Sequence, residues 1–560
     1  MRQANRRLRL LVAIFAVVFA AAFARVAWLQ AVKAQTLDHL ATTQNREAFD
    51  VPAARGTIFD RNGVQLAFSQ RATTVYANPK QVPDPRETAI AVGEALGLDA
   101  GKLYPLLTDR SRGFVYLARK VDPEKAEVLE AQELPGIGFQ DDERRVYPQR
   151  ALASELVGYA GTENRGLSGL ELELDKVLAG VSGSKTIVRD PFGRTIDVLE
   201  SEQVRDGRDV FLTIDNTLQG HVERVLHRAR TRWAAQSASA VVLDPQTGGI
   251  LALAVEPGFD ANDYPEVARW EEERLRNRAV TDTYEPGSTF KVVTVGGVLE
   301  TNLVSPTTKF RLPYEIPVAD RMIHDATPRG TKTMTVSEIL SHSSNVGVVT
   351  LAQQLQREGV NEWIQRFGFG RKTGIDFPGE SRGIVLQPDE WSGSTIGNVP
   401  IGQGIAVTPM QMAAAYGAIA NEGVWLQPHF VDRVEGRGRH QPEERRVISA
   451  TTARQLTKML RRVVEEGSGT TAQVDGYRVA GKTGTAAKPD PEGGYSETRY
   501  VASFVGFAPA KRPELVVLVT VDEPRGAIWG GTVAAPPFAE IMEFALPYLE
   551  VPPVRGRGSD

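Results

Sequence analysis

The chain has 560 residues, of which 42% are hydrophobic and 24% charged, and its formal net charge at pH 7 is −4. This composition is that of a globular protein long enough for two or more cores, and the nearly balanced charge argues against nucleic acid as a partner. The seven histidines are scattered, cysteine is absent, and no H-E-x-x-H or cysteine–histidine spacing indicates a metal site.

The amino-terminal segment predicts a membrane anchor. Four arginines precede the uncharged apolar run 10–24, which at about 1.5 Å per helical residue is about 22 Å long, short of the ~30 Å hydrocarbon core. Extension to residue 29, with Arg25 snorkelling outward, completes a span. Ala22-Phe23-Ala24 resembles a signal-peptidase site, so cleavage is the alternative. We expect a retained single-pass anchor over residues 1–30 with its arginine-rich end in the cytoplasm and everything after it outside.

The region between the anchor and about residue 204 alternates short strands, glycine turns and helices. Residues 55–63 predict a strand that enters a tight turn, and residues 122–129 predict a helix. We expect this region to be a structural and binding domain.

A denser apolar pattern begins near residue 209. Two runs joined by Asp-Pro-Gln-Thr-Gly, 238–243 and 250–255, predict a β-hairpin. The stretch from about 260 to 466 is mostly helical in pattern, with one helix delimited by Thr408 as its cap and Gly423 past its end. Further strands that extend the hairpin, and a closing helix, are expected at residues 478–481, 502–507, 515–521 and 534–546.

Three short boxes in this second half carry the chemistry. They are Ser288-Thr289-Phe290-Lys291, Ser343-Ser344-Asn345 and Lys482-Thr483-Gly484-Thr485. A serine, two lysines and an amide suit acyl transfer through a serine ester. Ser288 follows Pro286-Gly287 and opens an apolar run, so we expect it in the first turn of a buried helix with Lys291 on the same face. The alternative for Ser288 is a buried serine at the start of a core helix.

The first and third boxes each have a second copy in the chain. Ser182-Gly183-Ser184-Lys185 lies among glycines, and Lys372-Thr373-Gly374 lies in a loop punctuated by glycine and proline. Both copies are interpreted as linkers or turns.

The second box falls between two expected helices. Thr335 and Glu338 fit a capping box, which starts a helix that ends near His342, and a second helix begins at Val346. A side chain at such a junction can point into a cleft. An ordinary polar junction is the alternative.

The third box also overlaps a phosphate-binding pattern. Residues 476–483 match G-x-x-x-x-G-K-[ST], which would indicate a P-loop ATPase. A phosphate loop needs an apolar strand before its first glycine and a helix after its lysine. The upstream segment 468–473 is polar, and Gly484 and Pro489 oppose a helix. A strand that contains the lysine is therefore favoured over a nucleotide site.

Taken with their flanks, the three boxes resemble the penicillin-binding serine transpeptidases. Residues 55–63 and 166–171 resemble the pedestal domain of class B members, and residues 402–409 and 504–509 are most similar to the division-type branch. The resemblance implies an α/β multidomain protein: an antiparallel sheet flanked by helices with an all-helical subdomain, preceded by an elongated α+β pedestal and one transmembrane helix. The expected domains are 1–30 (anchor), 31–204 (pedestal or dimerisation-type domain), 205–548 (transpeptidase domain) and 549–560 (flexible tail).

The resemblance also implies an activity, D,D-transpeptidation of peptidoglycan stem peptides through an acyl-enzyme on Ser288. The protein would act without a cofactor in septal cell-wall synthesis and be acylated by β-lactams. Implied partners are the cytoplasmic membrane, a polytopic glycosyltransferase and other divisome proteins. An elongation-type transpeptidase is the alternative, followed by a β-lactam sensor or a β-lactamase, although no deacylating glutamate is identified.

Roles for the boxes follow from the chemistry and the resemblance. For Lys291 to act as a base near pH 7 its pKa must fall by about 3 units, through desolvation and the second cation Lys482. Lys482 is expected to stay protonated and to pair with Ser343, which relays the proton, while Asn345 orients the substrate and Lys291. Substrate-binding residues are expected at Thr483, Gly484 and Thr485, and the oxyanion donors at the backbone N–H groups of Ser288 and Thr485.

Overall fold

The computed structural model describes residues 2–33, 46–189, 195–263 and 275–553. The chain forms two compact units that interleave along the sequence. Unit 1 comprises residues 1–54, 71–143 and 180–206, and unit 2 comprises residues 55–70, 144–179 and 207–560. The expected limits at 204 and 548 remain predictions, because this packing does not divide the chain at a single point.

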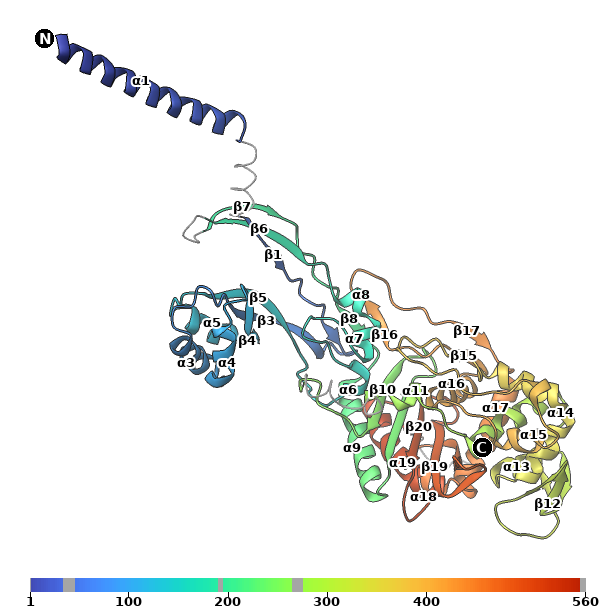
Figure 1. The fold of residues 1–560 in the computed structure, drawn as a ribbon. Coiled ribbons are helices and arrows are strands. Elements are labelled where there is room, and N and C mark those ends of the chain that lie inside the picture. The colour runs from blue at the N-terminus through green and yellow to red at the C-terminus, as the bar shows by residue number, and fades with distance from the viewer. Residues whose placement is uncertain (1, 34–45, 190–194, 264–274, 554–560) are drawn as a thin grey trace. The chain divides into compact units, whose positions relative to one another are not determined.

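The first helix, α1 (Arg2–Ala31), is a single uninterrupted element (Figure 1). Its stretch Asn5–Ala31 is long and apolar enough to cross a membrane, and none of its most apolar window is buried by the rest of the chain. These properties are consistent with a single-pass membrane anchor.

Unit 1 contains a three-stranded antiparallel sheet and a small helical head. The sheet has the order β1 (Arg46–Val51), β6 (Gly183–Arg189), β7 (Thr195–Ser201). In the head, β4 (Val115–Val121) pairs with the end of β3 (Gln65–Ala77), and apolar side chains of three helices pack against them. The helices are α3 (Pro85–Leu96), α4 (Ala100–Thr108) and α5 (Pro123–Glu130), the last of which begins after the cap Asp122 as predicted.

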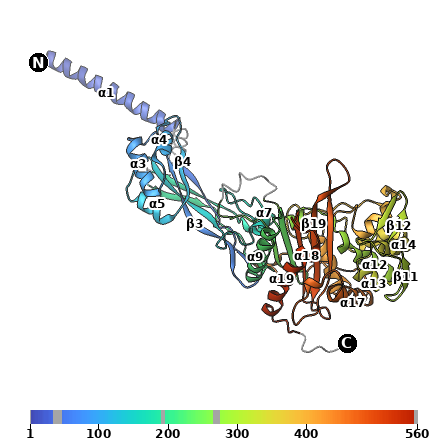
Figure 2. The same ribbon diagram turned by 90° about the horizontal axis from the view of Figure 1, so that it is seen from below.

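Unit 2 is built on a five-stranded antiparallel sheet. Its order is β10-β9-β20-β19-β18, so the predicted hairpin pairs with strands from the end of the chain, green beside red in Figure 2. The strands confirm the predicted positions and extend several of them. They are β9 (Ser237–Leu243), β10 (Ile250–Glu256), β18 (Ala480–Pro489), β19 (Tyr495–Ala508) and β20 (Leu515–Asp522).

Alternating side chains of this sheet are buried on both faces. In β20, Val517 and Val519 pack with α9 (Asn216–Arg232) and α19 (Ala535–Tyr548), whereas Val516 and Leu518 belong to the larger core that contains α16 (Pro409–Ala420). A strand that is covered on both faces is apolar at nearly every position, and in Leu515–Val521 the one polar side chain, Thr520, shares a hydrogen bond with Ser239 Oγ at 2.6 Å.

The nucleophile-bearing side of unit 2 is mostly helical. Its buried centre is α12 (Lys291–Glu300), surrounded by α13 (Val336–Ser341), α14 (Asn345–Arg366), α15 (Thr395–Asn398) and α17 (Ala450–Glu466). Two short strand pairs accompany these helices, so the subdomain is not wholly helical. The pairs are β11 (Lys309–Leu312) with β14 (Lys332–Thr335) and β12 (Glu315–Val318) with β13 (Arg321–His324).

Strand β2 (Ile58–Phe59) belongs to a six-stranded sheet of order β16-β8-β2-β3-β4, in which β5 (Ile137–Val146) also pairs with β3. In this sheet β2 runs parallel to β8 (Val210–Leu212), which pairs with β16 (Val431–Val434). The predicted tight turn follows β2, where Asp60 Oδ1 accepts from the N–H groups of Asn62 and Val64. The remaining elements are α6 (Ser154–Val157), α7 (Gly169–Glu173), α8 (Asp175–Leu178), α11 (Arg278–Thr281), β15 (Val424–Leu426), β17 (Glu444–Arg446) and α18 (Gly530–Val533).

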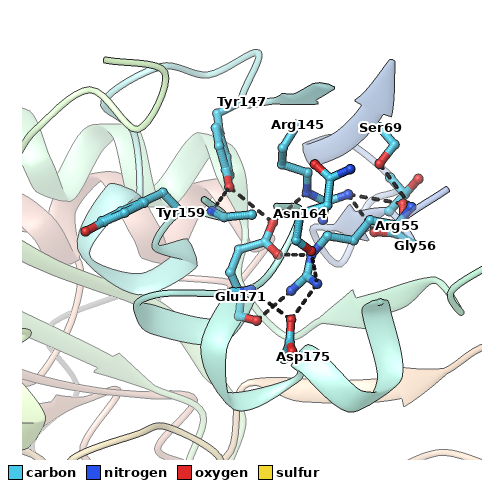
Figure 3. Close-up of polar contacts among 12 residues, drawn as sticks. Arg55, Gly56, Ser69, Arg145, Tyr147, Tyr159, Asn164, Glu171 and Asp175 are labelled. Carbon is cyan, nitrogen blue, oxygen red and sulfur yellow. Dashed lines mark hydrogen bonds and ion pairs between the residues drawn. The ribbon is translucent and has the colours of Figure 1, made fainter. Parts of the chain in front are cut away.

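A buried ionic cluster holds the early segments of unit 2 together (Figure 3). The Glu171 carboxylate is fully buried between Arg55 and Arg145, each of which donates from Nε at 2.6 Å. Arg55 also donates to Asp175 at 2.6 Å, and Arg145 donates to the Gly56 carbonyl at 2.8 Å. Because each buried carboxylate oxygen has a guanidinium partner, the cluster connects residues 55–70 to residues 144–179 without an uncompensated acid.

Candidate active site

The three boxes meet in one cleft of unit 2, of about 780 Å³. The nucleophile box contributes Ser288, the second box contributes all three of its residues, and the third box contributes Thr483 and Thr485. Other side chains at the cleft, which sequence patterns did not single out, include Arg321, His324, Asp325, Arg329, Gln403, Ser468, Tyr495 and Trp529.

Ser288 lies in a short 3₁₀ turn, Gly287–Phe290, that leads directly into α12. Gly287 has φ +54°, and a Cβ atom there would lie 2.9 Å from the Thr485 carbonyl oxygen. Glycine therefore permits both the left-handed backbone and the close approach of the turn to β18. This approach places the predicted nucleophile beside the third box.

Lys291 is fully buried and faces the second box. Its Nζ donates to the Ser343 carbonyl at 2.6 Å, to Asn345 Oδ1 at 2.6 Å and to Ser343 Oγ at 3.2 Å. Burial, followed by the charge of Lys482, holds the pKa of Lys291 well below its ordinary value, and the opposing charge of Asp325 only partly offsets this. The direction and both causes are those expected from the sequence.

Ser343 connects the nucleophile to Lys291. Its hydroxyl donates to Ser288 Oγ at 3.0 Å and accepts from Lys291 Nζ, so the three side chains form a hydrogen-bonded chain. Ser343 has φ +58° at the junction of α13 and α14. A non-glycine residue is held in this strained region only where its surroundings fix it, here at the predicted helix junction. The predicted capping box of Thr335 and Glu338 is present.

Lys482 lies in the middle of β18 and is fully buried. Its Nζ donates to the carbonyl oxygen and hydroxyl of Thr483, at 3.2 and 3.4 Å, and burial lowers its pKa to about 7. Among the hydrogen bonds of the described residues there is none from Lys482 to Ser343, so the expected pair is not formed. The amine donates instead to the two oxygens of the adjacent residue, Thr483. Burial thus works against the protonated state that is expected of Lys482.

The other residues of the third box form the wall opposite Ser288. Thr483 Oγ1 shares a hydrogen bond with Ser468 Oγ at 2.8 Å, and Thr485 Oγ1 accepts from the Gly530 N–H at 3.0 Å. Gly484 has no room for a side chain, since a Cβ atom would lie 2.3 Å from Ser503 Oγ. This strand edge presents hydroxyl groups to the cleft at alternate positions.

The duplicate motifs do not contribute to the cleft. Ser182 belongs to unit 1 and precedes β6, whereas the Thr373-Gly374 turn is held by Glu380 away from the cleft lining. The phosphate-loop alternative is wrong in structural terms, because the residues around and after Lys482 form a strand, where a helix is required. Within the described residues, no group of three or more histidine, cysteine, aspartate or glutamate side chains could hold a metal ion.

Two family models match the chain. One, described as the penicillin binding protein transpeptidase domain, matches residues 238–543, more than half of the chain, and the other, described as the penicillin-binding protein dimerisation domain, matches residues 50–212.

Curated relatives match over nearly their full length. Stage V sporulation protein D of Bacillus subtilis is 36% identical over 98% of this chain and 86% of its own length. Peptidoglycan D,D-transpeptidase FtsI of Escherichia coli is 33% identical over 94% of this chain and 89% of its own length. Among solved structures, penicillin-binding protein 3 of Mycobacterium tuberculosis in complex with ampicillin is 32% identical, with a TM-score of 0.72 over 91% of this chain and 98% of that one.

Proposed function

This chain belongs to the class B penicillin-binding proteins, serine-type peptidoglycan D,D-transpeptidases, and from that premise we propose how its own residues cross-link stem peptides. Ser288 Oγ attacks the carbonyl carbon between the two terminal D-alanines. The last D-alanine leaves, and the remainder stays on Ser288 as an ester. An amine of a neighbouring stem peptide then attacks the ester carbonyl, forms the cross-link and releases Ser288. Because the energy of the broken peptide bond is retained in the ester, no nucleotide is needed.

The proton of Ser288 passes through Ser343 to Lys291 once the two hydroxyl hydrogens turn toward the amine, and the burial that lowers the pKa of Lys291 favours this amine as the acceptor. Ser343 then returns a proton to the amine of the leaving D-alanine. Asn345 holds Lys291 by its Oδ1 and orients the substrate amide. In the second half-reaction the attacking amine gives up a proton to this path, and Ser288 Oγ regains one as the ester breaks.

The third box receives the substrate. Lys482, Thr483 and Thr485 attract the terminal carboxylate. Gly484, whose missing side chain would meet Ser503 and Pro286, lets β18 lie close to the turn of Ser288. The backbone N–H groups of Ser288 and Thr485 donate to the oxyanion, a contact worth ~3 kcal/mol in the transition state.

One observation carries this proposal: the hydrogen-bonded chain from Ser288 through Ser343 to Lys291, in which Ser343 lies 55 residues from Ser288 and 52 from Lys291 in sequence. Such an arrangement of nucleophile, relay and amine activates a serine for acylation. Among the hydrogen bonds of the described residues, the hydroxyl of the duplicate serine at position 182 accepts from the Ala53 N–H at 3.4 Å.

The test is the site and fate of a labelled penicillin adduct on the full-length protein in detergent. A long-lived adduct mapped to Ser288, and absent in Ser288→Ala, is expected. Label on the peptide that contains Ser182, or label that persists in Ser288→Ala, contradicts the assignment. A turned-over product would indicate a β-lactamase, and no adduct an idle scaffold or a sensor of another kind.

We propose further that α1 is retained as the anchor, with its amino terminus in the cytoplasm and the cleft outside, and that the protein acts in septal wall synthesis with a polytopic glycosyltransferase and other divisome proteins. The arginines before the apolar run support this orientation. The similarity of residues 402–409 and 504–509 to division-type members supports the septal role. A fluorescent fusion that concentrates at division sites is the expected result, and a lateral-wall pattern would favour the elongation alternative.

A further inference from the structure

A buried carboxylate that the mechanism above does not use lies next to the second box. Asp325 follows β13 and is 6% exposed. Its Oδ1 accepts from the Val346 N–H at 3.1 Å and from Ser344 Oγ at 3.0 Å, and its Oδ2 accepts from Arg329 Nε at 2.8 Å. Asp325 therefore holds the first turn of α14, at which the second box begins.

The neighbouring residue holds the same turn from the other side. The His324 carbonyl accepts from Asn345 Nδ2 at 2.9 Å, while Asn345 Oδ1 accepts from Lys291. Two consecutive residues, 324 and 325, thus fix three consecutive residues, 344–346. Ser343, with its left-handed backbone, precedes them directly, and such a conformation requires fixed neighbours.

The Asp325 carboxylate is itself held in place by a cation. Arg329 donates to it from two nitrogens, and the same guanidinium donates to the Leu312 and Gly330 carbonyls at 2.9 and 3.0 Å. These four bonds are between 2.5 and 3.0 Å long, and three of them are partly buried. A carboxylate with this number of partners cannot rotate away without breaking several charge-assisted hydrogen bonds.

Asp325 also matters for charge. Lys482 on β18 and Asp325 after β13 are the charged groups that act on Lys291, and they act in opposite directions: Lys482 lowers the pKa of Lys291 and Asp325 raises it. Arg329 forms an ion pair with Asp325 at 2.5 Å, which weakens the effect of the Asp325 charge on Lys291. The carboxylate thus contacts the second box and also opposes the charge of Lys482.

We propose that Asp325 is a positioning residue for acylation, which holds Ser343 and Asn345 against Lys291 through the first turn of α14 and places a negative charge in the field of the Lys291 amine. This inference rests on the proposed role of Lys291 as the base. It assigns Asp325 no contact with the substrate.

The test compares Asp325→Asn, Asp325→Glu and a matched control across pH, with second-order acylation rates of the full-length protein by labelled penicillin. The control is Asp215→Asn: Asp215 is also buried and caps a helix, α9, by accepting from the Thr217 and Leu218 N–H groups at 3.1 Å, and it does not line the cleft. Thermal melts at each pH report folding.

Asp325→Asn should acylate about tenfold to a hundredfold more slowly at the plateau, because the second box is no longer held in register. Acylation requires neutral Lys291, so the rate rises with pH through the pKa of Lys291. Loss of the Asp325 charge removes an influence that raises this pKa, and the acid limb should therefore move to lower pH. Asp325→Glu keeps the charge, so it should slow acylation without moving the limb, and Asp215→Asn should change neither.

A slow Asp325→Asn variant whose acid limb stays in place would overturn the proposal, because a purely structural role predicts that result. If Asp325→Asn does not fold, Arg329→Gln decides: it leaves the carboxylate uncompensated, so the limb should move to higher pH, and an unmoved limb would refute the proposal. Failure of the proposed function is distinguishable, since it would appear as the absence of a Ser288 adduct in the unmodified protein.

Discussion

Unit 2 contains two buried clusters of charged side chains that differ in how fully the charges are compensated. In the cluster of Arg55, Arg145, Glu171 and Asp175, burial works against the charge of Arg55, yet Glu171 and Asp175 outweigh it and the pKa of Arg55 rises. In the active-site cluster, burial dominates and lowers the pKa of both Lys291 and Lys482. Compensated charges stay fixed and hold the chain together, whereas undercompensated amines can exchange protons.

The largest expected effect is on the acylation rate, when each active-site lysine is replaced by arginine. Lys291→Arg should abolish acylation, because arginine cannot give up its proton and the general base, a contribution of about 10² to 10⁴-fold, is lost. Lys482→Arg keeps a cation and should retain measurable acylation. Second-order acylation rates for both variants, with folding checked by thermal melts, provide the measurement.

Equal rates for the two arginine variants would show that Lys291 is not the base. The proton would then have to travel through Ser343 to Lys482. The present geometry gives Lys482 no hydrogen bond to Ser343 within the described residues, so that route would require a rearrangement of the side chain.

The opposite experiment breaks the compensated cluster. Glu171→Gln removes the central charge and leaves Arg55 and Arg145 buried without it, which should lower the free energy of unfolding by about 3–5 kcal/mol. Denaturant unfolding measures this loss. The acylation rate per folded molecule should be unchanged, because the cluster does not line the cleft.

Glu540→Gln is the matched control for the effect of burial. It removes the ion pair between Glu540 and Arg228, both of whose side chains are about half exposed. The free energy of unfolding should fall by only about 0–1 kcal/mol. A similar cost for both glutamine variants would mean that compensation in the buried cluster contributes little to stability.

The smallest expected effect concerns Lys482 alone. Its pKa in the free protein is about 7, and a bound carboxylate should raise it, because an anion favours the ammonium form. The gain in affinity is therefore complete below pH 7 and is lost as the pH rises through the higher pKa of the complex, by at most about tenfold per pH unit. Titration of Ser288→Ala with a peptide that ends in D-alanyl-D-alanine measures it.

The double variant Ser288→Ala with Lys482→Met separates this effect from other titrations. It should bind the peptide weakly and without the pH dependence. If the dependence persists, another group is responsible for it.

Features of the fold that depend on residues close in sequence could be predicted from the sequence. The helix junction of the second box followed from the capping box at Thr335 and Glu338, and the strand that carries Lys482 followed from the breakers after it. Two features had no local signal. Asp325 contacts residues 19 and 21 positions away, and Glu171 pairs with arginines 26 and 116 positions away.

The crowded backbone around the nucleophile limits how the protein can change under antibiotic selection. A methyl group on Gly402 would lie 2.1 Å from the Gly287 carbonyl oxygen, and one on Gly484 would lie 2.9 Å from that of Pro286. Substitutions at these points would displace the turn of Ser288. The variant would then be acylated neither by its substrate nor by a β-lactam. Side chains at the rim, where Tyr495 is 45% exposed and Trp529 56% exposed, have room to vary while the turn stays unchanged.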